Sequence, residues 1–435
     1  MRKWAITGLL VLLAAMLSGC GAGEAADTYV EGSDYQYMQW VNGMFFPKVQ
    51  QTEDGCYFLY EGYLYYLDEQ TDTILPLCSK ADCLHEQEQR LPDIRTVAEE
   101  KEWLDRCNAC VSASSNTSSI GIAWCDGYLY CLAQDIPNEA GTRDAAGLYR
   151  CSKDGAKKDL LFRWDNNAMI GQWIVHRGVL YYVEQKYRIT DDISKVVYSL
   201  NALPLTGPVL RPETIYTVDE KIYTFSLNRP TAYGNYLYFT VLGDTEGPDI
   251  VTEENYLDYL YLKTFVYDIR DGQLGEIGLP NMTAYEAVSN VVFWQDRIVF
   301  RVSDFSDTKK DTYTFYSAAL DGSDPTVLLE DFPLWYLLSD GQYLYATDVE
   351  EAYKNGERGT CWVYDKNMEL VDTFQFPDVN YFASPLCAGQ TAYWPFAYNE
   401  ESQKQGKTGF GLMRWDKSKI GTYNGGVIEY TEIVR

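Results

Sequence analysis

The stretch CDGYLY, residues 125–130, places an Asp-Gly pair directly before a short run in which tyrosine and leucine alternate. Asp-Gly suits the primed turns of tight β-hairpins, because the central residues of these turns take positive φ. Alternating tyrosine and leucine is typical of a strand with one buried face. The segment therefore predicts a β-hairpin.

The same phrase recurs along the chain and predicts the fold. The starts of its copies are 65, 51, 57, 61, 45 and 48 residues apart, and most copies are followed by further short strands and turns. Multi-stranded repeats of this length are typical of β-propeller blades, because one blade cannot bury both of its faces alone. We expect an all-β propeller with seven blades, six or eight remaining open, rather than two β-sandwich domains. The copies are YEGYLYY (60–66), CDGYLY (125–130), HRGVLYY (176–182), YGNYLYF (233–239), WQDRIVF (294–300), SDGQYLY (339–345) and CAGQTAYW (387–394).

Two terminal segments are candidates for closing the ring. Residues 38–46 and 427–434 both read as strands, and a strand shared between the first and last blades is one way to close a propeller.

The first twenty residues predict export and lipidation. A basic start, an apolar run and the sequence Leu-Ser-Gly-Cys at 17–20 have the form of a lipoprotein signal. We expect cleavage before Cys20, lipid on its thiol and amino group, and a protein held at the cell membrane on its extracytoplasmic face. The expected domains are a signal peptide (1–19), the lipidated cysteine with a flexible tether (20–36) and the propeller (37–435).

The composition argues against some classes of partner and of catalytic site. The chain carries 36 Lys and Arg against 63 Asp and Glu, a net charge of −27, which argues against nucleic acid as a partner. Its two histidines and the lack of a Gly-x-Ser-x-Gly motif leave no recognisable hydrolase triad. His176 opens one copy of the repeat and reads as a residue of a blade turn.

An insertion between the first two repeats, residues 77–118, departs from the pattern. It contains Cys78, Cys83 and His85, then the pair Cys107 and Cys110, in the arrangement C-x4-C-x-H…C-x2-C. Three or four thiolates and one imidazole suffice for a tetrahedral zinc site, and residues 96–106 read as a short amphipathic helix that brings the two groups together. The alternative is disulfide bonding, which an exported chain with ten cysteines besides Cys20 permits. Cys131 and Cys151 are a further candidate pair.

With these features the chain resembles the tyrosine-rich propeller lipoproteins of Gram-positive anaerobes, relatives of the uncharacterised domain family numbered 5050. The likeness rests on the lipobox, the repeated phrases and the cysteine segment, and it covers nearly the whole mature chain. It implies a recurrent pattern of Cys-x4-Cys-x-His with a later cysteine. Cys78, Cys83, His85 and Cys107 match this pattern as metal ligands, with Cys110 as an additional or alternative ligand.

The resulting interpretation is a non-enzymatic propeller that binds or scaffolds a protein, peptide or glycan, with structural zinc as its one expected cofactor. The alternative is a polysaccharide-active enzyme, a glycoside hydrolase or lyase, with paired acids in the channel of the propeller. Paired carboxylates in the channel would favour hydrolysis, whereas Ser, Thr and apolar side chains would favour binding.

Overall fold

The computed structural model gives the fold over most of the chain. It describes residues 34, 49–52, 55–83, 85, 96–112, 121–137, 140, 142, 145–164, 168–189, 194–207, 209–219, 221–227, 230–246, 250–252, 255–283, 286–304, 312–334, 337–348, 357–376, 380–381, 386–388, 390–398, 404, 409–426 and 430–431. The expected signal peptide and Cys20 lie outside these residues.

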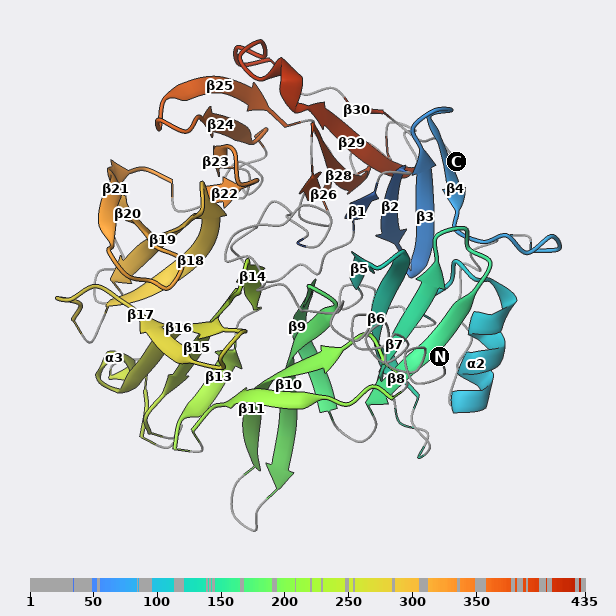
Figure 1. Cartoon of the computed structure of the whole chain (residues 1–435), viewed down its shortest axis with the longest axis horizontal. Helices are drawn as coiled ribbons and strands as arrows, with labels where there is room; N and C mark the ends of the chain where they lie inside the picture. The colour runs from blue at the N-terminus through green and yellow to red at the C-terminus, as the bar shows by residue number, and fades with distance from the viewer. Residues whose placement is uncertain are drawn as a thin grey trace, which may run out of the picture.

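Within the described residues the strands form seven antiparallel sheets. Figure 1 shows the sheets arranged as a ring, with β1, β5, β9, β14 and β26 nearest to its centre. The predicted all-β propeller is therefore confirmed, and we number its blades 1 to 7 in chain order. The blades contain four or five strands each, and consecutive strands pair within each blade except where β14 and β27 lie off the main path.

The first four blades contain seventeen strands. Blade 1 has β1 (Val49–Thr52), β2 (Gly55–Tyr60), β3 (Tyr63–Asp68) and β4 (Thr73–Pro76); blade 2 has β5 (Gly121–Cys125), β6 (Tyr128–Ile136), β7 (Ala145–Ser152) and β8 (Lys158–Trp164); blade 3 has β9 (Ala168–His176), β10 (Val179–Ile189), β11 (Ser194–Pro204) and β12 (Glu213–Thr217); blade 4 has β13 (Tyr223–Leu227), β14 (Thr231–Tyr233), β15 (Tyr236–Asp244), β16 (Leu260–Asp268) and β17 (Leu274–Ile277).

The last three blades follow the same plan. Blade 5 has β18 (Glu286–Trp294), β19 (Arg297–Asp304), β20 (Tyr313–Ala318) and β21 (Thr326–Phe332); blade 6 has β22 (Leu337–Ser339), β23 (Leu344–Thr347), β24 (Thr360–Tyr364) and β25 (Leu370–Gln375); blade 7 has β26 (Asn380–Tyr381), β27 (Leu386–Ala388), β28 (Thr391–Ala397), β29 (Phe410–Asp416) and β30 (Tyr430–Thr431). The helices whose bounds the structure describes are α2 (Val97–Arg106), α3 (Tyr256–Tyr259) and the 3-10 helix η1 (Lys417–Lys419). No helix among the described residues is long and apolar enough to cross a membrane.

The repeated phrases form hairpins as predicted. Asp126 and Gly127 take φ of 48° and 80° between β5 and β6, and Arg177 and Gly178 take 48° and 75° between β9 and β10. Positive φ at both positions is what a primed turn requires. In blades 2 to 7 the phrase joins the innermost strand to its neighbour.

The first copy of the phrase is out of step with the others. The turn at 61–62 joins β2 to β3, the second and third strands of blade 1, because β1 is an additional strand on the inner side. The connection that corresponds to the later copies is instead the one between β1 and β2, whose facing ends Thr52 and Gly55 pair with each other. Tyr60–Tyr66 therefore marks a real hairpin at a different place in its blade.

Of the C-terminal closing candidate, residues 427–434, the structure describes Tyr430 and Thr431. They form β30, which pairs with β29 of its own blade, and within the described residues blades 1 and 7 share no strand. The N-terminal candidate, residues 38–46, lies outside the described residues. Blade 7 instead contacts blade 1 through side chains, among them an ion pair of 2.7 Å between Arg414 and Asp72.

The core lies within and between the blades and is rich in aromatic rings. Trp173, Trp415 and Tyr345 are among its largest fully buried side chains. The nine cysteines whose side chains the structure describes are free, so the disulfide between Cys131 and Cys151 is not formed. These two residues are diagonal rather than opposite on β6 and β7, since Cys131 pairs with Tyr149. Both are buried, as expected of thiols that act as small apolar side chains.

Candidate metal centre

The described part of the insertion between blades 1 and 2 contains one helix, and its sequence explains both ends. α2 begins after Thr96, whose side chain accepts the Glu99 N–H while the Glu99 carboxylate accepts the Thr96 N–H, forming a capping box. Trp103 and Leu104 are buried on one face of the helix. The helix ends at Cys107, which takes an extended backbone conformation. The predicted helix at 96–106 is thus confirmed, and it delivers Cys107 at its C-terminal end.

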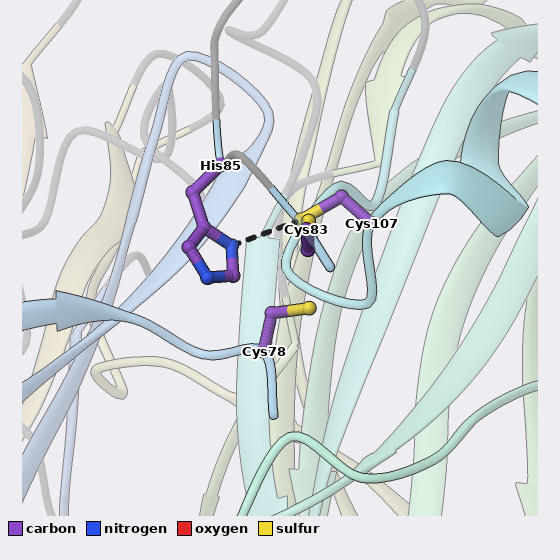
Figure 2. Close-up of side chains that lie close together, drawn as sticks. All are labelled: Cys78, Cys83, His85 and Cys107. Atoms are coloured by element: carbon purple, nitrogen blue, oxygen red, sulfur yellow. Dashed lines mark hydrogen bonds between the residues drawn. The ribbon is translucent and has the colours of Figure 1, made fainter. Parts of the chain in front are cut away.

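Four side chains of the insertion converge on one point. The Sγ atoms of Cys78, Cys83 and Cys107 and a ring nitrogen of His85 all lie within 4.8 Å of one another. Figure 2 shows the three sulfur atoms and the imidazole gathered together, and His85 Nδ1 is 3.9 Å from Cys107 Sγ. Cys107 is buried, and the other three side chains are partly exposed. The sequence prediction that these residues come together is confirmed.

The donor set fits a tetrahedral zinc ion. With Zn–S bonds of about 2.3 Å and Zn–N bonds of about 2.0 Å, the donors of such a site are roughly 3.5–3.8 Å apart. The 3.9 Å between His85 Nδ1 and Cys107 Sγ is already close to that range, and separations of up to 4.8 Å within the group would have to shorten by about 1 Å to complete the shell. His85 has a φ of 55°, a conformation that non-glycine residues adopt rarely and often at functional sites.

Cys110 does not belong to this group. Its side chain is buried, and its Sγ lies 3.5 Å from the carbonyl oxygen of Ser112. Its donor atom is not among those that lie within 4.8 Å of one another, so the structure groups Cys107 rather than Cys110 with the other three residues.

The polar surroundings of the thiols differ. Burial acts to raise the pKa of Cys78, but the Lys80 and Asn108 backbone N–H groups and the neighbouring thiols outweigh it and lower the pKa overall. The Asn108 N–H lies 3.4 Å from Cys78 Sγ. Burial dominates at Cys107 and raises its pKa to about 12. N–H groups directed at sulfur favour the thiolate form that a metal ligand needs, and Cys78 has two such groups.

The cluster lies at the junction of two blades. On the side of blade 2, Asn108 Nδ2 donates to the carbonyl oxygens of Gly155 and Ala156, at 2.8 and 3.0 Å. Ser79 N–H also donates to Gly155 at 3.3 Å. Gly155 has a φ of 67°, and a Cβ there would be 2.6 Å from the backbone of Leu77. Only glycine allows this close approach between the insertion and the β7–β8 turn.

The insertion is also attached to blade 1. Leu64 N–H donates to Ala109 O at 2.8 Å, and Val111 N–H donates to Gly62 O at 2.9 Å. These bonds flank a short antiparallel bridge between Tyr63 and Cys110. A metal held by Cys78 and Cys107 would therefore fasten both blades to the same small module.

One residue beside the cluster was missed by sequence reasoning. Lys158, at the start of β8, donates from Nζ to the carbonyl oxygens of Leu104, Cys107 and Cys110, the first two at 2.6 and 2.9 Å. Burial lowers the pKa of Lys158. In the sequence it is one of two adjacent lysines beside a turn, which is the usual pattern of solvent-exposed residues. No local signal distinguishes it.

The remaining candidates are structural or lie outside the described residues. His176 is buried in the turn of blade 3, where its Nε2 lies 2.7 Å from Gly234 O and burial lowers its pKa. This confirms it as a residue of a blade turn.

The strands around the centre of the ring carry little charge. The innermost strands, β1, β5, β9, β13, β14, β18, β22, β26 and β27, contain one carboxylate among their residues, Glu286. Its Oε2 accepts the Thr283 N–H at 2.8 Å. Within this part of the ring the structure shows no pair of facing acids.

Comparisons with known proteins find similarity among solved structures alone. No family model matches the sequence, and no curated protein is significantly similar to it. Among solved structures, an oligogalacturonate lyase in complex with manganese is similar over 85% of this chain and 92% of its own, at 14% identity and a TM-score of 0.49. The β-propeller domain of the Trilobed protease from Pyrococcus furiosus, described as having an open velcro topology, is similar over 88% of this chain and 94% of its own, at 8% identity and a TM-score of 0.45. The acylaminoacyl peptidase of Pyrococcus horikoshii is similar over 91% of this chain and 53% of its own, at 9% identity and a TM-score of 0.46. At these identities the likeness concerns the fold alone.

Proposed function

We propose that this protein is a lipid-anchored, extracytoplasmic β-propeller that binds a protein, peptide or glycan partner without catalysing a reaction. The observation that carries the proposal is the composition of the innermost strands, where Glu286 is the one carboxylate among the described residues. Its side chain accepts a backbone N–H of an adjacent turn, so it is engaged in local structure. Glycoside hydrolysis requires two carboxylates facing each other across the sugar.

The side chains that replace acids on these strands are suited to binding. β1 carries Gln50 and Gln51. Gln50 is buried and bridges to blade 2, donating to Ile122 O at 3.3 Å and accepting from Trp124 N–H at 3.2 Å, so of the two amides Gln51 is the one that is partly exposed. Amides offer both donors and acceptors without a change of protonation. They can fix the orientation of a peptide or a sugar, but they do not supply a general acid or base.

In this proposal Cys78, Cys83, His85 and Cys107 hold a structural zinc ion. Three thiolates and one imidazole fill all four tetrahedral positions, which is the arrangement of structural rather than catalytic zinc. The ion would join the two blades that the insertion already contacts by hydrogen bonds. Its contribution is to stability, because the insertion alone is too small to hold a core.

Binding and catalysis are separated by one pair of assays on the full-length protein in mild detergent. The protein is incubated with a panel of extracellular polysaccharides, and both retention and the release of new reducing or unsaturated ends are measured. Retention without new chain ends is the expected result. Chain cleavage that scales with protein concentration would contradict the proposal and favour the enzyme.

The anchor has its own test, since Cys20 lies outside the described residues. Cells expressing the protein are labelled with an alkyne fatty acid and fractionated. We expect the label in the membrane fraction, and we expect Cys20→Ala to lose both the label and the membrane association. Membrane association that persists in Cys20→Ala would rule out the lipid as the anchor.

A further inference from the structure

The side chain of Lys158 is held beside the metal cluster by an unusual set of partners. Its three N–H donors all point to backbone carbonyls, those of Leu104, Cys107 and Cys110. An ammonium has three donors and a neutral amine has two, so three acceptors fit the charged form. Two of these carbonyls lie at the C-terminal end of α2, where the helix is partially negative.

Among the described residues no carboxylate forms an ion pair with Lys158. The nearest aspartate in sequence, Asp159, instead faces Arg150 at 3.4 Å. A cation that is drawn out of water needs a compensating negative charge, and partial charges on carbonyls supply only part of it.

The cluster can supply the missing charge once it holds a metal. A divalent ion with two positive charges, bound by three thiolates and one neutral imidazole, carries a net charge of −1. Lys158 donates directly to the carbonyl of Cys107, which is one of the three thiolate residues. The positive charge of Lys158 would then balance the net negative charge of the metal centre, with Cys107 connecting the two.

We propose that Lys158 is the charge partner of the metal centre, its ammonium balancing the single negative charge of a divalent ion held by Cys78, Cys83, His85 and Cys107. The inference rests on the proposed metal centre and goes beyond it by assigning a residue of blade 2 to the affinity of the site. Lys158 is a positioning residue, because it acts through Cys107 and does not contact the ion.

The test measures zinc affinity of the full-length protein in detergent by competition with a chromogenic chelator. Lys158→Met and Lys158→Gln should weaken zinc binding about 10- to 100-fold, the usual effect of losing a partner of a ligand residue. Lys158→Arg keeps the charge and should stay within about fivefold of the unaltered protein. The matched control is Lys157→Met, an exposed neighbour, which should change the affinity less than about twofold.

Lys158→Gln distinguishes charge from hydrogen bonding. Glutamine retains N–H donors for the carbonyls but has no charge, so a structural role would be rescued by Gln, whereas a role as charge partner would be rescued only by Arg. The zinc-saturated variants are compared by circular dichroism to show that each is folded.

A double-mutant cycle gives a second, independent measurement. Cys83→His changes the donors to two thiolates and two imidazoles, which makes the centre neutral. In that background Lys158→Met should weaken zinc by less than about threefold, because no charge remains to balance. An equal loss in both backgrounds would overturn the proposal and leave Lys158 as a helix-capping residue.

Zinc binding by the unaltered protein and by Lys158→Gln distinguishes a wrong metal centre from a wrong role for Lys158. If the unaltered protein binds no zinc, the metal centre itself is wrong, and the charge partner falls with it. If the unaltered protein binds one zinc and Lys158→Gln binds it equally well, only the role of Lys158 is overturned.

Discussion

The ring of Phe410 in blade 7 stacks on the ring of Tyr60 in blade 1, with centroids 4.1 Å apart and planes inclined by 12°. Phe410 also contacts the rings of Phe58 and Tyr65, at 6.1 and 5.0 Å. The described residues contain no strand shared between these blades. Side-chain packing therefore joins blades 1 and 7 at the seam between them, through residues that are 350 positions apart in the sequence.

The first prediction concerns the seam between blades 1 and 7, where Phe410 packs on Tyr60. Phe410→Ala should lower the free energy of unfolding by about 3–5 kcal/mol, since it removes a buried ring and leaves a cavity between blades. Hydrogen exchange should increase first in β2, β3, β28 and β29. The matched control is Phe315→Ala, which removes a fully buried ring from blade 5. The control should lose similar stability, with its faster exchange confined to blades 5 and 6. Faster exchange in the same blades for both variants would show that the seam has no local role.

The sequence predicted what short-range patterns encode. Asp-Gly pairs before tyrosine-rich runs identify hairpins because turn chemistry is local, and the amphipathic pattern of residues 96–106 identifies α2 because the period of a helix is also local. The cluster was predictable because Cys78, Cys83 and His85 are close in sequence. The packing of Phe410 on Tyr60 could not be predicted, since any buried aromatic has the same pattern. The position of Lys158 beside the cluster could not be predicted either. Its partners are backbone carbonyls, which every residue has, so the sequence does not identify them.

The metal centre makes a second prediction. Cys83→Ser should lose the bound zinc and lower the melting temperature, because the link between the insertion and both blades is weakened. If free zinc exceeds its dissociation constant about 1,000-fold, removing the metal from the unaltered protein with a chelator should cost about 4 kcal/mol. Native mass spectrometry and thermal melting measure both effects.

The matched control for the metal centre is Cys110→Ala. Cys110 lies in the same insertion but outside the ligand group, so this variant should keep one zinc ion. A Cys83→Ser variant with unchanged melting would exclude a structural role for the cluster. Loss of zinc in Cys110→Ala as well would mean that the ligand set is misassigned.

A buried ion pair makes a third prediction. Lys417 Nζ lies 2.9 Å from Asp340 Oδ2, with side chains 7% and 0% exposed, and it joins η1 of blade 7 to the β22–β23 turn of blade 6. Lys417→Met should destabilise the protein by about 3–5 kcal/mol, because Asp340 is left as a buried charge without its cation. Denaturant unfolding measures the change.

The double variant isolates the cost of the unpaired charge. Adding Asp340→Asn to Lys417→Met should recover part of the loss, because the remaining group is then neutral. The exposed pair Lys101 and Asp105 is the control, with side chains 74% and 57% exposed, and Lys101→Met should cost less than about 1 kcal/mol. A double variant that is less stable than Lys417→Met would contradict this explanation.

Asp372 makes the last prediction, which concerns pH. Burial acts to raise the pKa of Asp372, but the backbone N–H groups of Tyr423, Asn424, Thr373 and Gly421 outweigh it and lower the pKa overall. The Gly421 N–H lies 2.7 Å from Oδ2. Since the folded-state pKa is below the unfolded value of about 3.9, the ionised carboxylate stabilises the fold. This contribution is fully present above about pH 4 and is lost as the pH falls through the lowered folded-state pKa.

Asp372→Asn should therefore cost about 1–3 kcal/mol at neutral pH, because an amide oxygen accepts these N–H groups more weakly and its NH2 group opposes them. The difference from the unaltered protein should narrow when urea unfolding is repeated near pH 3, where the aspartate itself begins to take up a proton. Asp271→Asn, at an exposed turn with one N–H partner, should cost less than about 0.5 kcal/mol. A difference for Asp372→Asn that stays constant between the two pH values would show that the hydrogen bonds matter but the charge does not.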